Sequence, residues 1–507
     1  MATESPVAPA RSHPNPFAFP SDTGFRFAVL ILSVLGAGLI IFDLVFLSIP
    51  TIQRWFLRRH VTCFGLHGTS TEMTNLNHCL AEVRLAQVGW SLGGTLLLLL
   101  VAVLMYWYYP AWKMRRNELR SLVAEDVPEV VTYLEELCRE AHLETAPVFL
   151  WDPLNPAIYG LALGRWGRYY IVISGGLVTR FYTDRPVFRA VVLHELAHLR
   201  NGDVSRAYFT VAVWRAFLVV VLGALLAVQL WYLNTSPLTV ATLTVGVAAL
   251  TGLVYVIRNG VLRARELYAD VRASLWDGPD GALVRVLESL QRPEHRWLGP
   301  ILRMHPDPHA RRLAVENPGR LFRLNFWDTF VAGVAAGRVL PDLVYLLSLA
   351  TQGVLTSVGT SPWIASAVAV GIPTAGVIGA GAWREAFAAH IGDSSEPRTW
   401  RLGLGAGLGL AVGHILALTA LVARSSAAGT QVGEQWSTRP IVLSATLAVN
   451  IFWFTLLLIV LILLSIWISD SARAWLQSDA TRRSPRPAFW ANVLAAGFVL
   501  GVGMGLV

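Results

Sequence analysis

The chain has 507 residues, of which 54% are hydrophobic and only 15% are charged. This excess of apolar residues excludes an ordinary series of soluble domains and is typical of a membrane protein. The formal net charge is +8, but the arginines are spread over segments between apolar runs and form no basic patch interleaved with aromatic residues. The charge therefore reflects membrane topology, and no nucleic-acid partner is expected.

The sequence predicts an N-terminal tail followed by membrane spans. Residues 1–24 are rich in Pro, Ser and Ala and are expected to be disordered. About nine apolar runs, each of roughly 17–28 residues, are long enough to cross a ~30 Å hydrocarbon core. They lie near 27–49, 87–109, 208–232, 238–257, 342–358, 363–383, 402–423, 441–468 and 489–507. The first run is too long for a signal peptide and is interpreted as a retained anchor. The start of the fifth run is interrupted by Arg338, Pro341 and Asp342.

Basic residues indicate which loops face the cytoplasm. With nine spans, four basic clusters fall on one side, after the second, fourth, sixth and eighth spans. The positive-inside rule makes that side cytoplasmic and places the C-terminus outside. The loop at 51–86 is then external, although its arginines fit the positive-inside rule less well. An external, oxidising compartment would permit a disulfide between Cys63 and Cys79 in this loop. Cys138 falls in the cytoplasmic part, where we expect a reduced and partly buried thiol.

The first cytoplasmic block, 111–206, is expected to mix helix and strand. Helical periodicity over 127–141 precedes three short strand patterns at 147–151, 157–163 and 169–174, which are separated by Pro, Asn and Gly. A small sheet of this kind leaves an edge that can pair with an extended peptide.

The next helix carries the sequence His-Glu-Leu-Ala-His. Asp184 is the expected N-cap. Residues four apart share one helix face, so His194 and His198 can ligate one metal ion, as in H-E-x-x-H zinc sites. Glu195 can take a proton from a water molecule at that metal. The alternative is a surface helix with two unrelated histidines.

Two histidines leave a catalytic zinc one protein ligand short. The best candidate for the third is Glu266, on a helix expected from Asn259 to Leu275 in the second cytoplasmic block, 258–326. Asp270 follows four residues later on the same face and can accept a hydrogen bond from the other nitrogen of a ligating imidazole. The alternative is a solvated, charged helix face.

These motifs resemble the integral-membrane zinc metallopeptidases that include the HtpX heat-shock protease and the type I CAAX prenyl proteases. The resemblance covers roughly residues 150–315. It includes the H-E-x-x-H with its trailing Asn-Gly-Asp, and the two spans between that motif and Arg-x-x-Glu-x-x-x-Asp. It also includes Asn155-Pro-Ala-Ile-Tyr-Gly160, similar to an edge strand of the family, and His305-Pro306 with Arg311.

The resemblance implies a role for each of these residues. The zinc ligands would be His194, His198 and Glu266, with Glu195 as catalytic base and acid and Asp270 behind an imidazole. His305 and Arg311 would steady the oxyanion or the substrate carbonyl, and Asn155 would hold the substrate backbone at the edge strand. Otherwise His305 caps a turn and Arg311 is a membrane-surface charge.

The sequence departs from the family pattern at two points. Pro156 replaces the usual Ala and removes one N–H from the expected substrate edge. The spans after residue 327 have no counterpart in the shorter bacterial members. His414, Asp43 and Asn450 lie within spans, where we expect structural hydrogen bonds between helices.

We therefore predict a polytopic α-helical membrane protein with a cytoplasmic α+β zinc metalloprotease domain of the gluzincin type. It is expected to use one zinc ion per chain and to hydrolyse membrane-associated or modified peptides and proteins at the cytoplasmic face of the cell membrane. The lipid bilayer is its other partner, and the oligomeric state is left open. The expected parts are the tail 1–24, two spans with an external loop in 25–110, the protease domain 111–326 interrupted by spans at about 208–257, and the C-terminal multi-span region 327–507.

The sequence leaves three other functions as alternatives. The first is a catalytically silent membrane sensor or scaffold, which the intact Glu195 disfavours. The second is a site-2-type intramembrane protease, which needs its H-E-x-x-H inside a span and is disfavoured by Arg189 and Arg200 beside the motif. The third is a transporter with a structural metal site, which would rest on the C-terminal spans alone.

Overall fold

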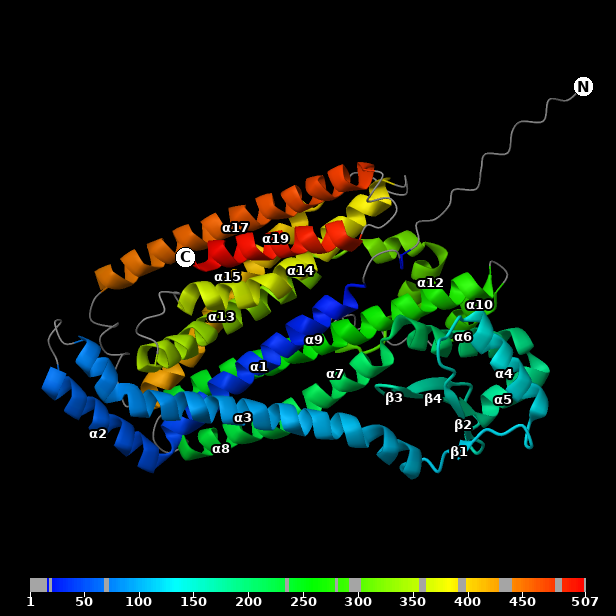
Figure 1. Cartoon of the computed structure of the whole chain (residues 1–507), viewed down its shortest axis with the longest axis horizontal. Coiled ribbons are helices and arrows are strands. Elements are labelled where there is room, and N and C mark those ends of the chain that lie inside the picture. Colours follow the sequence, from blue (N-terminus) through cyan, green and yellow to red (C-terminus); the bar gives the residue numbers. More distant parts are fainter. Residues whose placement is uncertain are drawn as a thin grey trace, which may run out of the picture.

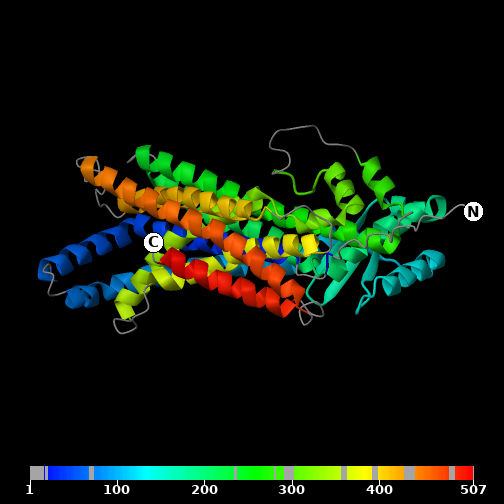
Figure 2. The ribbon, with the colours of Figure 1, turned by 90° about the horizontal axis from the view of Figure 1, so that it is seen from above.

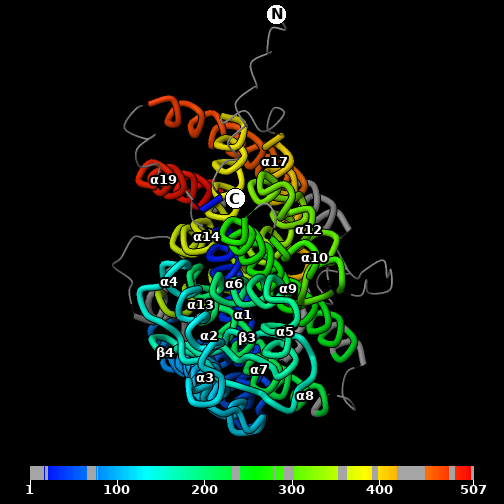
Figure 3. The backbone as a smooth tube through the Cα atoms, turned by 90° about the vertical axis from the view of Figure 1, so that its right-hand side faces the viewer, coloured from blue at the N-terminus to red at the C-terminus, as the bar shows by residue number. Residues whose placement is uncertain are grey.

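The computed structural model of the chain is mostly helical. It describes residues 16–17, 21–67, 73–232, 237–278, 281–290, 302–354, 362–390, 398–427, 440–478 and 486–505. The tail predicted for 1–24 lies mostly outside these residues. Long helices lie side by side over most of the molecule, and a small sheet with short helices gathers at one end (Figures 1 and 2). Seen from that end, α14, α17 and α19 lie on the side away from the sheet (Figure 3).

Three helices begin the described chain. They are α1 (Thr23–Ser48), α2 (Pro50–His67) and α3 (Met73–Arg116). A disulfide joins Cys63 of α2 to Cys79 of α3, the pair that the sequence allowed. With 44 residues, α3 is about 66 Å long at 1.5 Å per residue, twice the ~30 Å of a hydrocarbon core.

The sheet has four strands in the order β1-β2-β4-β3. They are β1 (Arg120–Ser121), β2 (Val148–Asp152), β3 (Gly160–Arg165) and β4 (Arg168–Ser174). β2 and β4 are parallel, while β3 pairs antiparallel with β4 and is an edge strand. The three predicted strands are confirmed. The two-residue β1 was missed because so short a segment has no measurable alternation.

Helices α4 (Pro128–Glu140), α5 (Gly175–Thr183) and α6 (Arg185–Asn201) cover the sheet. The predicted N-cap of α6 is confirmed, because the Asp184 side chain accepts a hydrogen bond from the Val187 N–H. The helix ends at Gly202, whose φ of +65° lies in the left-handed region that favours glycine. Cys138 lies in this core, and burial, followed by the Glu135 charge, raises the pKa of its thiol to about 11.

The next helices lead from the sheet into the bundle and back. They are α7 (Val204–Ala216), a π-helical turn (Phe217–Leu222), α8 (Gly223–Tyr232) and α9 (Pro237–Asp277). The expected start of a separate helix at Asn259 is wrong. The fourth apolar run and Glu266 share the single 41-residue helix α9, because no proline or cap separates them.

The remaining elements follow α9. They are α10 (Leu283–Ser289), α12 (Pro308–Glu316), the 3₁₀ turn Pro318–Phe322, α13 (Phe326–Val354), α14 (Pro362–His390), α15 (Trp400–Ala427), α17 (Pro440–Gln477) and α19 (Arg486–Gly505). The expected start of the fifth run near 342 is wrong, because α13 begins sixteen residues earlier. Arg338 and Asp342 lie one helical turn apart and form a buried ion pair, so their charges do not break the helix.

Within the described residues, eight helices are long and apolar enough to cross a membrane. Each overlaps one of the first eight predicted runs. They are Thr23–Ser48, His78–Arg116, Val204–Leu230, Leu243–Asp277, Pro318–Thr351, Pro362–His390, Trp400–Leu418 and Ile451–Gln477. The ninth run falls in α19, a 20-residue helix that is not among these eight.

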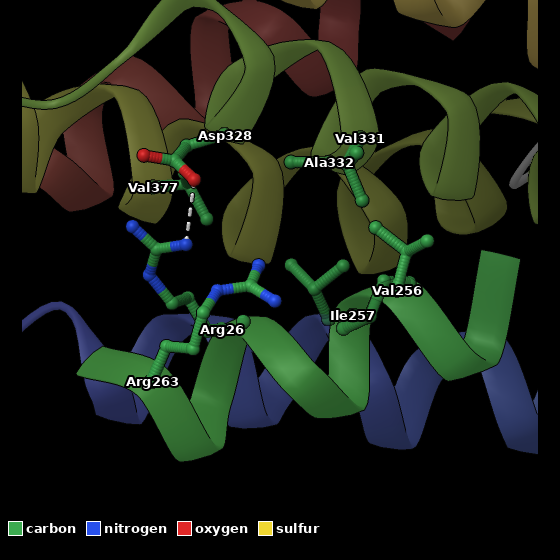
Figure 4. A pocket seen from close by; sticks show the side chains of 10 residues that line it. Arg26, Val256, Ile257, Arg263, Asp328, Val331, Ala332 and Val377 are labelled. Atoms are coloured by element: carbon green, nitrogen blue, oxygen red, sulfur yellow. Dashed lines mark hydrogen bonds and ion pairs between the residues drawn. The ribbon is translucent and has the colours of Figure 1, made fainter. Parts of the chain in front are cut away.

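A polar contact connects the C-terminal helices to α1 close to α9. Arg26 of α1 lies 2.7 Å from Asp328 of α13 and 2.7 Å from Asp22. Arg263 of α9 lies beside them, around a cavity of about 40 Å³, which is room for little more than a water molecule (Figure 4).

Candidate active site

Two helices bring three candidate ligands together. His194 and His198 lie on α6, and Glu266 lies on α9, which packs against α6 (Figure 1). Their ligand atoms lie within 4.8 Å of one another, and all three residues are buried. The Glu266 carboxylate is 3.8 Å from Nε2 of His194 and 3.6 Å from Nε2 of His198.

Each imidazole faces a carboxylate on its other side. Asp270 lies 3.0 Å from Nδ1 of His194, and Asp203 is hydrogen-bonded to Nδ1 of His198 at 3.1 Å. Burial opposes a charge on His194, but the Asp270 and Glu266 carboxylates raise its pKa to about 10. Sequence reasoning gave Asp203 no role. The signal was the Asn-Gly-Asp after the motif, since Gly202 turns the chain back and brings Asp203 to His198.

This donor set fits a catalytic zinc ion. Two imidazoles and one carboxylate are the protein ligands of many such sites, and carboxylates behind the imidazoles aim their Nε2 atoms at the metal. The three ligand atoms here converge from two helices, and their burial excludes most competing water. The alternative of two unrelated surface histidines is wrong, because both rings are buried and point at one carboxylate.

Glu195 lies between α6 and the edge of the sheet. Its Oε2 accepts a hydrogen bond of 2.6 Å from the N–H of Ala162 on β3. A side chain at position 160 would obstruct this arrangement, since a Cβ on Gly160 would lie 2.7 Å from Cγ of Glu195. The glycine therefore permits the close approach of the Glu195 side chain to the edge strand.

His305 and Arg311 contact different carboxylates around the cluster. Nδ1 of His305 is 3.5 Å from Glu266, and its side chain is 69% exposed, at the rim of the site. Arg311 is mostly buried and donates two hydrogen bonds to Asp270, from Nε at 2.6 Å and Nη2 at 2.7 Å. Burial opposes its charge, but the Asp270 carboxylate raises the pKa of Arg311 above its ordinary value.

Asn155 lies in the turn between β2 and β3. Its Oδ1 accepts a hydrogen bond from the Ala157 N–H at 3.1 Å, and its Nδ2 donates to Asp152 at 3.3 Å. Within the part of the chain that the structure describes, these bonds keep its side chain in its own turn and away from the histidines.

A cavity adjoins the cluster on the side of the membrane-length helices. It has a volume of about 180 Å³ and lies between β3 and helices α3, α7 and α9. Its wall is mainly apolar, with Glu266 and His305 at the polar end. The apolar part includes Leu161, Tyr208, Val211 and Leu262.

Arg265 was also missed by sequence reasoning. Its Nη2 lies 3.0 Å from Glu266 and 3.3 Å from Nε2 of His198, and it lines the same cavity. The neighbour of a ligand in sequence normally points to another helix face, so its position carried no signal.

Comparisons with known proteins point to a family of peptidases. Residues 125–318 match the model of peptidase family M48. The protease HtpX homolog of Aquifex aeolicus (strain VF5) is 24% identical, over 46% of this chain and 80% of that protein. The protease HtpX homolog of Salinibacter ruber (strain DSM 13855 / M31) is 29% identical, over 42% of this chain and 77% of that protein. No solved structure matches the chain significantly.

The family match assigns the class of reaction and the need for a metal. Family M48 consists of metallopeptidases, and the His-His-Glu cluster lies inside the matched residues. With its membrane-length helices, the chain is a multi-pass membrane hydrolase that cleaves peptide bonds. Together, the family match and these relatives support an HtpX-like metallopeptidase of family M48 in residues 125–318.

Proposed function

We propose that this chain is a zinc-dependent endopeptidase of the gluzincin type. His194, His198 and Glu266 hold one zinc ion per chain. The observation that carries this proposal is the convergence of three buried ligand atoms, with a carboxylate behind each imidazole. When bound, zinc polarises the scissile carbonyl and makes a water molecule more acidic.

Glu195 is the proposed base and acid. It takes a proton from the attacking water as the new carbon–oxygen bond forms, and passes that proton to the nitrogen as the carbon–nitrogen bond breaks. Its contact with Ala162 supports this role, because an extended substrate that pairs with the edge strand β3 would lie alongside the Glu195 carboxylate.

Three residues around the cluster receive supporting roles. Because Arg311 donates two hydrogen bonds to Asp270, we assign it to holding Asp270 behind His194, in place of the direct oxyanion contact expected from the resemblance. His305, at the rim beside Glu266, is the better candidate for contact with the substrate carbonyl. Asn155 shapes the turn that leads into β3 and so supports the substrate edge.

The proposed substrate is a membrane-associated or modified peptide or protein, cleaved at the cytoplasmic face. The mainly apolar cavity between β3 and the membrane-length helices supports this class. The basic clusters support the orientation. The proposed division keeps the protease in 111–326, around spans at about 208–257, and a multi-span region in 327–507.

Metal analysis and kinetics test the proposal together. In detergent-purified full-length protein, His194→Ala and His198→Ala should lose most of the bound zinc, while His309→Ala, outside the cluster, keeps it. Glu195→Gln should keep zinc and lose peptide hydrolysis by several orders of magnitude. If both histidine variants bound as much zinc as the wild type, the proposed zinc site would be wrong.

Two further measurements address substrate and orientation. Glu195→Gln protein from native membranes should retain peptides, which mass spectrometry identifies. A reporter fused after Arg200 should read cytoplasmic and one near Ser70 external, and the opposite result would place the protease outside the cell.

A further inference from the structure

Arg265 makes close contact with two of the three proposed zinc ligands. Its Nη2 is 3.0 Å from Oε1 of Glu266 and 3.3 Å from Nε2 of His198. The side chain is only 17% exposed, so these contacts are shielded from bulk water. A full positive charge therefore lies against the atoms that would bind the metal.

The hydrogen-bonding chemistry of Arg265 fixes the form of His198. A guanidinium has donors only, so Nε2 of His198 must accept with its lone pair. The ring proton then sits on Nδ1 and is donated to Asp203 at 3.1 Å. This is the tautomer that a metal ligand requires, and the lone pair that Arg265 engages is the one the metal would take.

One lone pair cannot serve a guanidinium and a metal ion at the same time. Occupation of His198 by zinc therefore requires the hydrogen bond from Arg265 to break. The charge of Arg265 acts in the same direction, because it offsets the negative charge of Glu266 and repels a divalent cation a few ångströms away.

We propose that Arg265 is a resident cation of this site that competes with zinc for His198 and Glu266 and so weakens zinc binding. This inference rests on the proposed function. It makes Arg265 a positioning residue that keeps both ligands in their metal-binding forms while it lowers the affinity of the site. No other described residue has a fixed positive charge within hydrogen-bond distance of two proposed ligands.

The zinc dissociation constant of full-length protein in detergent tests this directly, by competition with a chromophoric chelator. Arg265→Met removes the competitor and should bind zinc more tightly, on the order of 10- to 100-fold, the usual size of effects from groups behind the ligands. Arg265→Lys, which keeps the charge without the planar fork, should fall between Arg265→Met and wild type.

Two control variants test the direction of the change in zinc affinity and its specificity for Arg265. Asp203→Asn removes the negative charge of the acceptor behind His198 and should weaken zinc binding, the opposite direction. Arg272→Met makes the same charge change on the same helix, at a residue that contacts Asn201 instead of a ligand, and should leave the affinity near wild type. Unchanged or weaker zinc binding in Arg265→Met would overturn the proposal.

A measurement on the wild-type protein tests the competition between Arg265 and zinc even if a variant fails to fold. Phenylglyoxal modifies free guanidinium groups, and peptide mass spectrometry gives the rate at Arg265. Zinc should accelerate this modification, because it frees the guanidinium from both partners; an equal or slower rate contradicts the inference. If wild-type protein binds no zinc through His194 and His198, the proposed function itself fails, which is a separate result.

Discussion

The two histidines of the cluster are supported from behind in different ways. His198 is held by Asp203, which lies just after the end of the same helix, between α6 and α7. His194 faces Asp270, and Asp270 is itself held by Arg311 from α12. The position of His194 therefore depends on α9 and α12 as well as on its own helix, and α12 acts on His194 through Asp270.

Arg311→Ala should affect the site strongly. It leaves the fully buried Asp270 carboxylate without its cation, and breaking a buried pair costs about 3–5 kcal/mol. We expect lower thermal stability, weaker zinc binding by chelator competition, and at least a tenfold fall in kcat. Arg311→Lys should recover part of the zinc affinity, which a role in stability alone does not predict.

Arg312→Ala is the matched control for Arg311. Arg312 pairs with Glu288 and Glu316 at the surface, where such pairs contribute less than about 1 kcal/mol. Zinc affinity and kcat should stay near wild type. If Arg311→Ala and Arg312→Ala lost zinc affinity and kcat equally, α12 would have no specific role in the site.

At the scale of elements, local patterns predicted the helix and the strands around the candidate site well. The N-cap, the proline and the four-residue spacing placed α6 and both histidines, and alternation between turn residues found three strands. Glu266 and Asp270 were found because their spacing puts them on one helix face. These signals lie within about a dozen neighbouring residues, which is the range over which a sequence determines its own backbone.

Contacts between elements could not be predicted in this way. Arg265 meets His198 only after α6 and α9 have packed, and no periodicity in the sequence records that contact. The starts of α9 and α13 were missed for another reason. An apolar run marks the part of a helix that crosses lipid, while the helix continues through polar residues until a cap or proline stops it.

Glycines let α13 and α15 approach closely. A Cβ on Gly337 would overlap the carbonyl oxygen of Leu410, and one on Gly409 would overlap that of Phe330. Small residues at such contacts allow membrane helices to pack backbone to backbone.

Gly337→Ala should therefore destabilise the protein, by about 1–3 kcal/mol, the usual cost of overpacking. Gly93→Ala is the control, since nothing lies within 4 Å of a Cβ at that site in α3. It should be neutral or slightly stabilising, because alanine favours helix over glycine. Detergent unfolding followed by circular dichroism compares the two; equal stability would mean that the close approach has no energetic weight.

At the scale of the whole molecule, the C-terminal helices lie beyond the residues that match the family model. The family match ends at residue 318, and α13 begins at Phe326. The ion pair between Arg26 and Asp328 joins α13 to α1 beside Arg263 (Figure 4). Helices α13 and α15 also contact α9, so the C-terminal region supports the helix that carries Glu266.

A double-mutant cycle measures this contact. Arg26→Ala and Asp328→Ala should each lower the free energy of unfolding by about 1–3 kcal/mol, as expected for partly buried, charge-assisted hydrogen bonds. Their effects should be less than additive, because either change removes the same pair. Strict additivity would show that the two side chains are energetically independent.

The continuity of α9 has a consequence for the environment of the enzyme. One unbroken helix contains a membrane-length apolar segment and carries Glu266, while both histidines lie on α6, which is not among the membrane-length helices found in the described residues. A helix whose apolar length differs from the thickness of the bilayer tilts or shifts to compensate. Such a movement also displaces Glu266, which lies on the same rigid helix, and so lengthens or shortens the distance between its carboxylate and the two histidines. Hydrolysis by the reconstituted protein should therefore pass through a maximum as vesicles are made from lipids of increasing chain length. A rate of hydrolysis that does not change with bilayer thickness would mean that α9 bends between its apolar segment and Glu266.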